Sequence, residues 1–207
     1  MAMGVEFELK FRATPEQLDK VEQGISGAVQ VIQMETTYYD TADGALSQRK
    51  YTLRRRMENG VSVCTLKTPE MRNAEGSVPY TRNDAPGRRE FEVNCDSIEK
   101  AIPELCKLSG VGLTALTAGG VAPVCGARFT RVASTLELPE CTVEIALDRG
   151  VLLGGGREIP LCEMEVELKS GSRESAALYA MALAQTYGMK SEKHSKFRRA
   201  LDLARGE

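Results

Sequence analysis

The sequence predicts one α+β domain that spans residues 1–207 and is dominated by antiparallel strands. Two observations lead to this fold class. Short segments in which apolar and polar residues alternate recur along the chain, as half-buried strands require, because successive strand side chains point to opposite faces. Helix-like segments with capping residues fall between these strands and after them. No internal repeat or low-complexity linker divides the chain, so we expect a single domain.

The first strand and the first helix illustrate both patterns. In VEFELKF, residues 5–11, the apolar residues share one parity and the charged residues share the other. Thr14, Pro15 and Glu16 then supply an N-cap, a proline at the first helical position and a first-turn acid, which predicts a helix over about residues 15–25. By the same criteria, further strands are expected at residues 35–41, 50–57, 61–67, 88–93, 127–137, 141–149 and 161–168.

Turn residues and helix caps account for most of the remaining chain. Residues 69–87 are rich in turn-forming residues and predict a long loop or a ragged hairpin. GGGREIP, residues 154–160, predicts a turn between the last two strands. Three more helical segments are expected: from Asp96 or Ser97 to about Leu108 with a kink or break at Pro103, from Ser172 to Gly188, and in the last part of the basic tail 190–206.

The composition argues against several classes of function. A formal net charge of −2 argues against a general nucleic-acid or membrane-surface binder. No apolar run is long enough to span a membrane, and the N-terminus lacks the apolar core of a signal peptide. The six cysteines are scattered without a CxxC pair and His194 is the only histidine, so a zinc site is not expected. We therefore expect a cytoplasmic protein with reduced thiols that binds neither nucleic acid nor membrane.

The polar faces of the predicted strands are segregated by charge. Glu163, Glu165 and Glu167 share one face of CEMEVEL, whereas Arg54 and Arg56 share one face of YTLRRR. Carboxylates this close to one another cost stability unless cations lie among them. Two interpretations are compatible with the pattern: a plain solvent-exposed face, or a closed barrel whose charged lumen holds water, ions and an anionic ligand. The same alternation places Glu6, Glu8, Lys10, Lys67, Glu90, Glu92, Glu144 and Asp148 on polar faces.

Taken in order, these motifs resemble the CYTH superfamily, whose members are also called triphosphate tunnel metalloenzymes. The hallmark of that family is an N-terminal ExExK, to which Glu6, Glu8 and Lys10 are similar. The resemblance continues in order over nearly the whole chain, and the ordered set is far more specific than any one piece. Its further parts are TYYDT at 37–41, the arginines Arg54 and Arg56, TLK with Lys67, the acids Glu90 and Glu92, FTR with Arg131, EIALD with Glu144 and Asp148, the glutamates of CEMEVEL, and SKFRR with Lys196.

The resemblance implies a closed antiparallel β-barrel of about eight strands with flanking helices, which forms a tunnel for a triphosphate and a divalent metal. Arginine forks and lysine ammonium groups suit phosphate oxygens, whereas Mg²⁺ or Mn²⁺ takes carboxylate and phosphate oxygens. The expected substrate-binding residues are Lys10, Arg54, Arg56, Lys67, Arg131 and Lys196. The expected metal ligands are Glu6, Glu8, Glu144, Asp148, Glu163 and Glu165, with Glu167 as an outer candidate.

Lys10, Glu8 and Glu165 are the expected catalytic residues. Lys10 would be a poor base because nearby carboxylates raise its pKa, so water activated by the metal or by a glutamate is an equal alternative. His194 is assigned to an exposed tail, whereas Arg199 is assigned to a basic C-terminal helix end, with a cation of the lumen as the alternative.

The resemblance implies hydrolysis of a triphosphate compound, in the first place of inorganic tripolyphosphate to pyrophosphate and phosphate. Class IV adenylyl cyclase, which forms cyclic AMP from ATP, and thiamine triphosphatase are the alternatives within the family, because the same cradle serves all three. A polyphosphate- or nucleotide-binding module and a structural protein with solvated strands are the alternatives outside enzymes. Substrate-specific contacts are expected in residues 69–87. The oligomeric state is not readable from the sequence, and a homodimer through an outer sheet face is one option.

Overall fold

The computed structural model describes residues 4–69 and 88–207, with side chains from Phe7 onward. The strands of these residues form one antiparallel sheet of ten, in the order β1-β6-β5-β4-β3-β7-β8-β9-β2-β10. Of the predicted loop 69–87, only Pro69, which ends β5, lies within the described residues. The strands are β1 (Gly4–Glu6), β2 (Glu8–Arg12), β3 (Gln30–Asp40), β4 (Thr52–Glu58), β5 (Val61–Pro69), β6 (Arg88–Asn94), β7 (Ala122–Glu137), β8 (Cys141–Gly154), β9 (Arg157–Gly171) and β10 (Lys190–Ser191). The helices are α1 (Pro15–Gly24), α2 (Ala45–Gln48), α3 (Ile98–Ser109), α4 (Leu113–Leu116), α5 (Arg173–Thr186) and α6 (Lys196–Arg205).

β1, at one end of the sheet, and β2, next to the strand at the other end, are consecutive in the chain. β1 pairs with β6 and β2 pairs with β9, and only Phe7 separates β1 from β2. The backbone amide of Leu168 in β9 donates to the carbonyl oxygen of Phe7 at 2.9 Å. The chain itself therefore connects the two ends, whereas no hydrogen-bonded ladder among the described strands closes the order into a ring. The antiparallel sheet with flanking helices is confirmed, but the predicted closed barrel of about eight strands is not.

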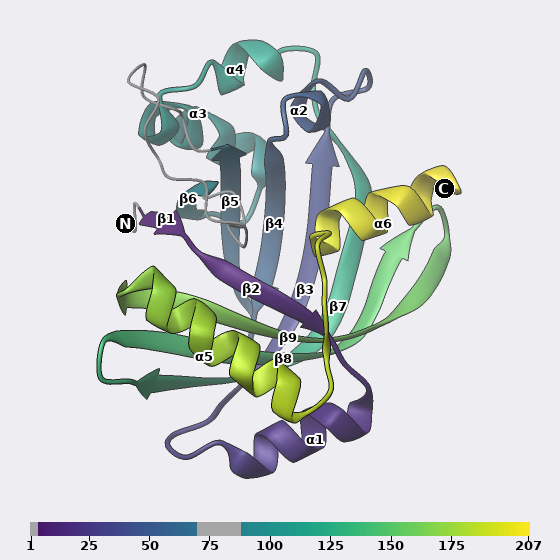
Figure 1. The fold of residues 1–207 in the computed structure, drawn as a ribbon. Coiled ribbons are helices and arrows are strands. Elements are labelled where there is room, and N and C mark those ends of the chain that lie inside the picture. The colour runs from purple at the N-terminus through teal and green to yellow at the C-terminus, as the bar shows by residue number, and fades with distance from the viewer. Residues whose placement is uncertain (1–3, 70–87) are drawn as a thin grey trace.

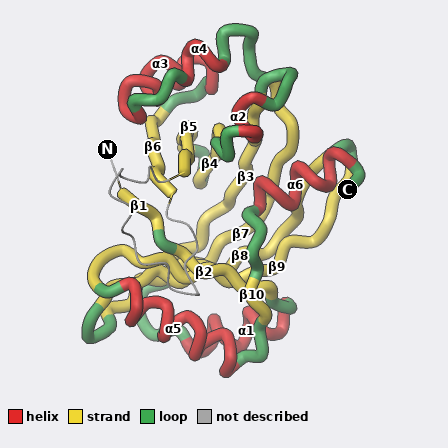
Figure 2. Tube along the Cα trace, turned by 45° about the horizontal axis from the view of Figure 1, so that its top comes forward, coloured by secondary structure: helices red, strands yellow, loops and turns green. Residues whose placement is uncertain are grey.

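The sheet is strongly curved. In Figure 1, β4 and β5 run upright, whereas β8 and β9 bend round to cross the lower part of the molecule. Figure 2 shows α1 and α5 at one end of the molecule and α3 and α4 at the opposite end. Among the helices of the described residues, none has the length and apolar character needed to cross a membrane.

Helices cover the apolar face of the sheet. α1 and α5 pack with β2, β8 and β9 in one buried cluster that includes Phe11, Leu18 and Val166. α3 and α4 pack with β4, β5 and β6 in a second cluster that includes Leu53 and Leu66. Because strand side chains alternate, the charged residues of these strands lie on the opposite face. This arrangement agrees with the flanking helices that the resemblance implies.

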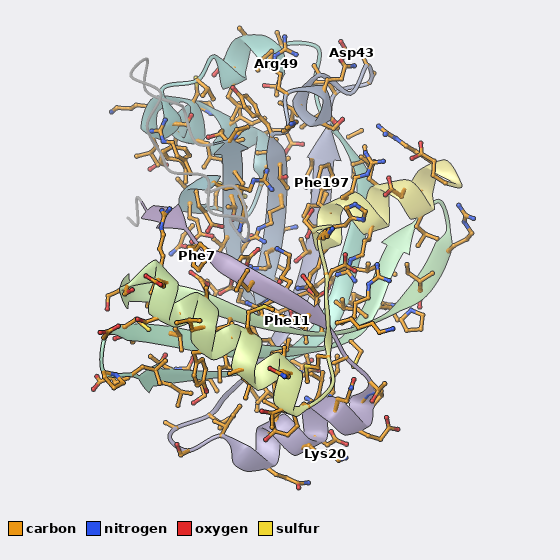
Figure 3. The ribbon with its side chains drawn as sticks, in the orientation of Figure 1. Phe7, Phe11, Lys20, Asp43, Arg49 and Phe197 are labelled. Carbon is orange, nitrogen blue, oxygen red and sulfur yellow. The ribbon has the colours of Figure 1, made fainter. Side chains whose placement is uncertain are left out.

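α6 lies on the charged face of the sheet. Its residue Ala200 packs with Phe129 of β7 and Leu152 of β8 in a third buried cluster. The ring of Phe197 lies 5.1 Å from the ring of Tyr38 in β3, and Figure 3 shows Phe197 at the N-terminal end of α6. The helix expected in the basic tail is confirmed, and it forms part of the structure around the charged residues.

Several elements differ from the sequence prediction for identifiable reasons. β8 and β9 form a longer hairpin than predicted, because the left-handed φ angles of Gly155 (57°) and Gly156 (72°) build a tight turn directly after Gly154. Pro103 does not break α3, since it is exposed and the loss of one backbone hydrogen bond leaves the packing of Leu105 intact. The sequence does not predict α2, α4 and β10, because segments of four residues or fewer show no usable periodicity.

Candidate active site

The register of the strands gathers charged side chains on one face of the sheet. Directly opposed residues of paired antiparallel strands project to the same side. Lys10 of β2 lies opposite Glu165 of β9. Asp148 of β8 lies opposite Glu163 of β9 on one side and Arg131 of β7 on the other. The alternation seen in the sequence therefore becomes a continuous charged patch across four strands.

Three carboxylates form a buried cluster in this patch. Carboxylate oxygens of Asp148, Glu163 and Glu165 lie within 4.8 Å of one another, and the three residues are 0%, 0% and 9% exposed. The ammonium of Lys196 lies among them, 2.7 Å from Asp148 and 2.8 Å from Glu165, and it also contacts Glu163. Carboxylates can be buried together in this way only when cations lie close to them.

Two arginines complete the charge balance of the cluster. The guanidinium of Arg131 donates two hydrogen bonds of 2.8 Å to Asp148 and one of 2.6 Å to Glu165. Arg199 of α6 donates to Glu163. The cluster thus joins three acids to three bases. Of the two alternatives for Arg199, the structure supports the cation among the acids rather than the solvated helix end. Its i,i+3 spacing from Lys196, which places both on one helix face, is a usable signal for this in the sequence.

Opposite charges shift the pKa values of several of these groups. Burial favours the neutral form of Glu165, but Lys196 and Arg131 outweigh it and hold the pKa of this carboxyl well below its ordinary value. Burial likewise opposes the charge on Lys196, but the three carboxylates outweigh it and raise its pKa. Lys10 shows the same balance: burial lowers its pKa, whereas Glu8 and Glu165 raise it above the ordinary value overall. Both lysines are therefore protonated at neutral pH, and Lys10 is a cation rather than a base.

A second group of charged residues lies on β4, β5 and β6. The guanidinium of Arg54 lies 3.1 Å from Glu90, and the ammonium of Lys67 lies 3.2 Å from the same carboxylate oxygen. A terminal nitrogen of Arg56 contacts Glu58. These residues share a face with the buried acid cluster, because the register continues from β7 through β3 to β4 and β5.

Arg56 has an unsatisfied donor in this group. Its Nε atom is buried and has no hydrogen-bond acceptor among the described residues. Burial, then the positive charge of Arg54, lowers the pKa of Arg56, although Glu58 opposes this shift. A buried N–H group without an acceptor is rare in native proteins and points to a ligand or water. An anionic oxygen would satisfy the donor and offset the repulsion between the two arginines.

Glu8 and Glu144, two further predicted metal ligands, lie outside the buried cluster. Glu8 accepts from the ammonium of Lys10 at 2.8 Å. Glu144 lies 3.4 Å from Lys169, in a more exposed part of the same face. Glu6 ends β1, and its side chain lies outside the described residues.

Glu192, which is not among the predicted site residues, extends the charge network. Glu192 is buried and accepts from the guanidinium of Arg12 and from the backbone amide of His194, the latter at 2.8 Å. It also lies 3.7 Å from Arg199. The only signal in the sequence is that Glu192 interrupts a run of basic residues with one acid.

The donor chemistry of the buried cluster fits a hard divalent cation. Asp148, Glu163 and Glu165 offer carboxylate oxygens that converge on one point, and oxygen ligands are those that Mg²⁺ and Mn²⁺ prefer. Lys196 lies at this point and contacts all three carboxylates. A divalent ion that bound all three oxygens would therefore share them with the ammonium or replace it.

Comparisons with known proteins agree with this geometry. The CYTH domain family matches residues 4–201. The inorganic triphosphatase of Haemophilus influenzae is 30% identical over 172 residues, which are 81% of this chain and 46% of that protein, so the chain spans about half the length of this curated relative. The fold is similar to that of the PH1819 protein of Pyrococcus horikoshii, with a TM-score of 0.61 and 23% identity over 97% of this chain and 99% of that one. It is also similar to HpAC1 from Hippeastrum, described as having a dominant triphosphatase activity, with a TM-score of 0.57 and 15% identity over 99% and 96% of the two chains. With these matches and this arrangement of charges, the chain belongs to the CYTH domain family.

Proposed function

We propose that the protein is a metal-dependent hydrolase that converts inorganic tripolyphosphate to pyrophosphate and phosphate. The observation that carries the proposal is the pairing of two kinds of site on one face. A buried group of carboxylates lies on β8 and β9. Arginines lie on β4, and one of them, Arg56, has a buried donor without an acceptor among the described residues. A triphosphate with a bound divalent metal has the complementary charges for both. The name of the Haemophilus relative supports the same class of substrate.

The basic side chains would bind the phosphate oxygens. Arg54, Arg56 and Lys67 on β4 and β5 can hold one end of the triphosphate, because they lie together on one face. Lys10, protonated at neutral pH, would bind an oxygen rather than remove a proton from water. Arg131 and Lys196 would neutralise charge that develops on the transferred phosphoryl group.

The acidic side chains would hold the metal. Asp148, Glu163 and Glu165 are the main candidates, and Glu8 beside Lys10 is the nearest candidate base for the attacking water. Bound Mg²⁺ or Mn²⁺ would polarise the phosphoryl group and lower the pKa of a bound water. Glu6 and Glu144 are further candidate ligands.

Phosphate release from tripolyphosphate, ATP and thiamine triphosphate, each with Mg²⁺, with Mn²⁺ and with a chelator, tests the proposal. We expect rapid release from tripolyphosphate that needs metal and falls at least about 10²-fold in Glu8→Gln, the loss typical of a general base. Glu158→Gln is the matched control, because Glu158 also lies in the sheet but pairs with Arg128 in solvent.

Chromatography of the ATP reaction separates this proposal from its alternatives. Cyclic AMP and pyrophosphate as the main products would identify a cyclase instead. Binding of tripolyphosphate without turnover under either metal would identify a binding module.

A further inference from the structure

The glycine turn between β8 and β9 contacts α6 more closely than any side chain would allow. A Cβ atom on Gly154 would lie 2.7 Å from the backbone nitrogen of Ala204 and nearer still to the carbonyl oxygen of Ala200. Real Cβ atoms do not approach backbone atoms this closely. The φ angle of Gly154 is not left-handed, so an alanine would fit its backbone conformation and only the contact with α6 excludes it.

α6 presents its smallest side chains to this turn. Lys196, Ala200 and Ala204 are spaced by four residues and therefore lie along one face of the helix. Ala200 and Ala204 let the helix backbone reach the turn, and Ala200 is fully buried there. Next to the turn, the guanidinium of Arg157 donates to the carbonyl oxygen of Leu203 near the end of α6. The turn thus holds the C-terminal half of α6 at two adjacent points.

The same helix face delivers Lys196 to the acid cluster. Its ammonium contacts three carboxylates that come from β8 and β9, the two strands that the glycine turn connects. The hairpin of β8 and β9 therefore supplies the three acids. It also supplies the surface against which α6, the helix that carries Lys196, packs. A shift of α6 away from the turn would draw Lys196 out of contact with all three acids together.

We propose that Gly154 is a positioning residue that sets the depth of α6 and so places the ammonium of Lys196 among Asp148, Glu163 and Glu165. Gly154 itself touches neither substrate nor metal in this proposal. The kinetic part rests on the hydrolase function proposed above, whereas the structural part does not.

Gly154→Ala tests this inference, and Gly156→Asn is the matched control. Gly156 lies in the same turn, but no described atom lies within 4 Å of a Cβ placed there, and asparagine tolerates its left-handed φ of 72°. The chain has no tryptophan, so Phe197→Trp introduces a single tryptophan next to Lys196, against the ring of Tyr38, whose emission can be followed selectively. We expect a shifted tryptophan emission in Gly154→Ala and unchanged emission in Gly156→Asn, both measured in the Phe197→Trp background after circular dichroism has shown that each variant is folded.

Arg157→Gln provides a second variant that introduces no steric clash. It removes the hydrogen bond to Leu203, so we expect a smaller emission shift in the same direction. This variant keeps the inference testable if Gly154→Ala does not fold.

Kinetics with tripolyphosphate should show a fall in kcat of about 10²-fold in Gly154→Ala, the loss typical of a 1 Å misplacement, with a smaller change in KM. In a Lys196→Met background, Gly154→Ala should cost little further activity, because the group that it positions is absent. If Gly154 had a structural role alone, the losses of activity caused by the two substitutions would instead be independent.

Unchanged emission in a folded Gly154→Ala protein, or a shifted emission with normal kcat, would overturn the inference. If Gly154→Ala shifts the emission but no protein in the series, including the parent with Gly154, has triphosphatase activity, the proposed function would be overturned and the positioning of α6 would stand.

Discussion

Lys196 shows how a single charge can determine the state of a whole site. Its side chain is only 9% exposed, and its ammonium lies within hydrogen-bond distance of three carboxylates. Desolvation makes such a cation costly by itself, and the same holds for the acids around it. Each charge is therefore stable in its place only because the others are present.

Lys196→Met should lower the free energy of unfolding at pH 7 by about 3 kcal/mol or more, because the three buried carboxylates lose a shared cation. Urea unfolding followed by circular dichroism measures the change. Lys193→Met, which removes an exposed lysine three residues earlier, should change stability by less than about 0.5 kcal/mol. Equal effects of the two substitutions would mean that the ion network does not stabilise the fold.

Glu165 gives the stability of the protein a defined dependence on pH. Its pKa in the folded protein is held well below the ordinary value, so the unfolded chain takes up this proton first as the pH falls. The stability that Glu165 contributes is present above the unfolded pKa of about 4.3 and is lost as the pH falls below it toward the folded pKa. The difference in unfolding free energy between wild type and Glu165→Gln should therefore be largest near pH 7 and shrink steadily below about pH 4.3. Urea midpoints at several pH values measure it, and a difference that grows on acidification would contradict the assignment.

At the scale of elements, the motif TYYDT has a local structural role. Asp40 at the end of β3 is buried and accepts from the backbone amides of Thr41, Leu46 and Ser47, at 2.8, 2.9 and 3.1 Å. Thr41 also accepts from the amide of Ala45 at 2.8 Å. These bonds cap the start of α2 and form the connection from β3 to β4. Asp40 therefore anchors the connection that leads to β4, the strand that carries Arg54 and Arg56.

Asp40→Ala should cost about 2 kcal/mol of stability, because it leaves buried amides without their charged acceptor. Chemical denaturation measures this loss. Asp43→Ala is the control at the same connection, since Asp43 is exposed and should cost less. If Asp40→Ala were as stable as wild type, water would have to satisfy those amides.

The sequence identifies most strands because their alternation is a local property. The partners Lys10 and Glu165, or Asp148 and Arg131, are on the expected faces for the same reason. The position of α6 could not be predicted in this way. Its basic pattern suits an exposed helix, whereas contacts such as the close approach of Ala200 to Gly154 and of Phe197 to Tyr38 seat it on the charged face. Contacts of that kind join segments that are distant in sequence and leave no periodic signal.

At the scale of the whole molecule, a net charge of −2 conceals two strongly charged regions that share one face of a curved sheet. The sequence indicates that these charges face the same side, but it does not define how the sheet is completed. The closed barrel was expected from the resemblance. In the structure, the two sides of the described sheet are joined by the chain between β1 and β2, and no hydrogen-bonded ladder among the described strands closes the sheet. In the function that we propose, this face would bind a ligand of complementary charge at the expense of the stability of the fold.

Arg56→Gln should separate ligand binding from stability. The substitution removes a buried cation that Arg54 repels, so the stability of the free protein should change by less than about 1 kcal/mol. The increase in thermal midpoint on addition of tripolyphosphate should shrink markedly, because ligand stabilisation follows affinity and reaches about 2.7 kcal/mol at a concentration of 100 Kd. Differential scanning fluorimetry with and without tripolyphosphate measures both quantities. A full shift in Arg56→Gln would remove this arginine from the binding site.

The junction of β1 and β2 at Phe7 also has a consequence for how the chain is made. Residues 4–12 leave the ribosome early, yet they pair with β6 and β9, and Glu8 lies opposite Glu167. During synthesis this segment must wait until nearly all the described chain has emerged before both of its neighbours exist. Until then the edges of β6 and β9 stay open to other extended chains, including other nascent copies. Contacts of such large sequence separation make folding slow, so we expect chaperones that shield strand edges to raise the yield of folded protein.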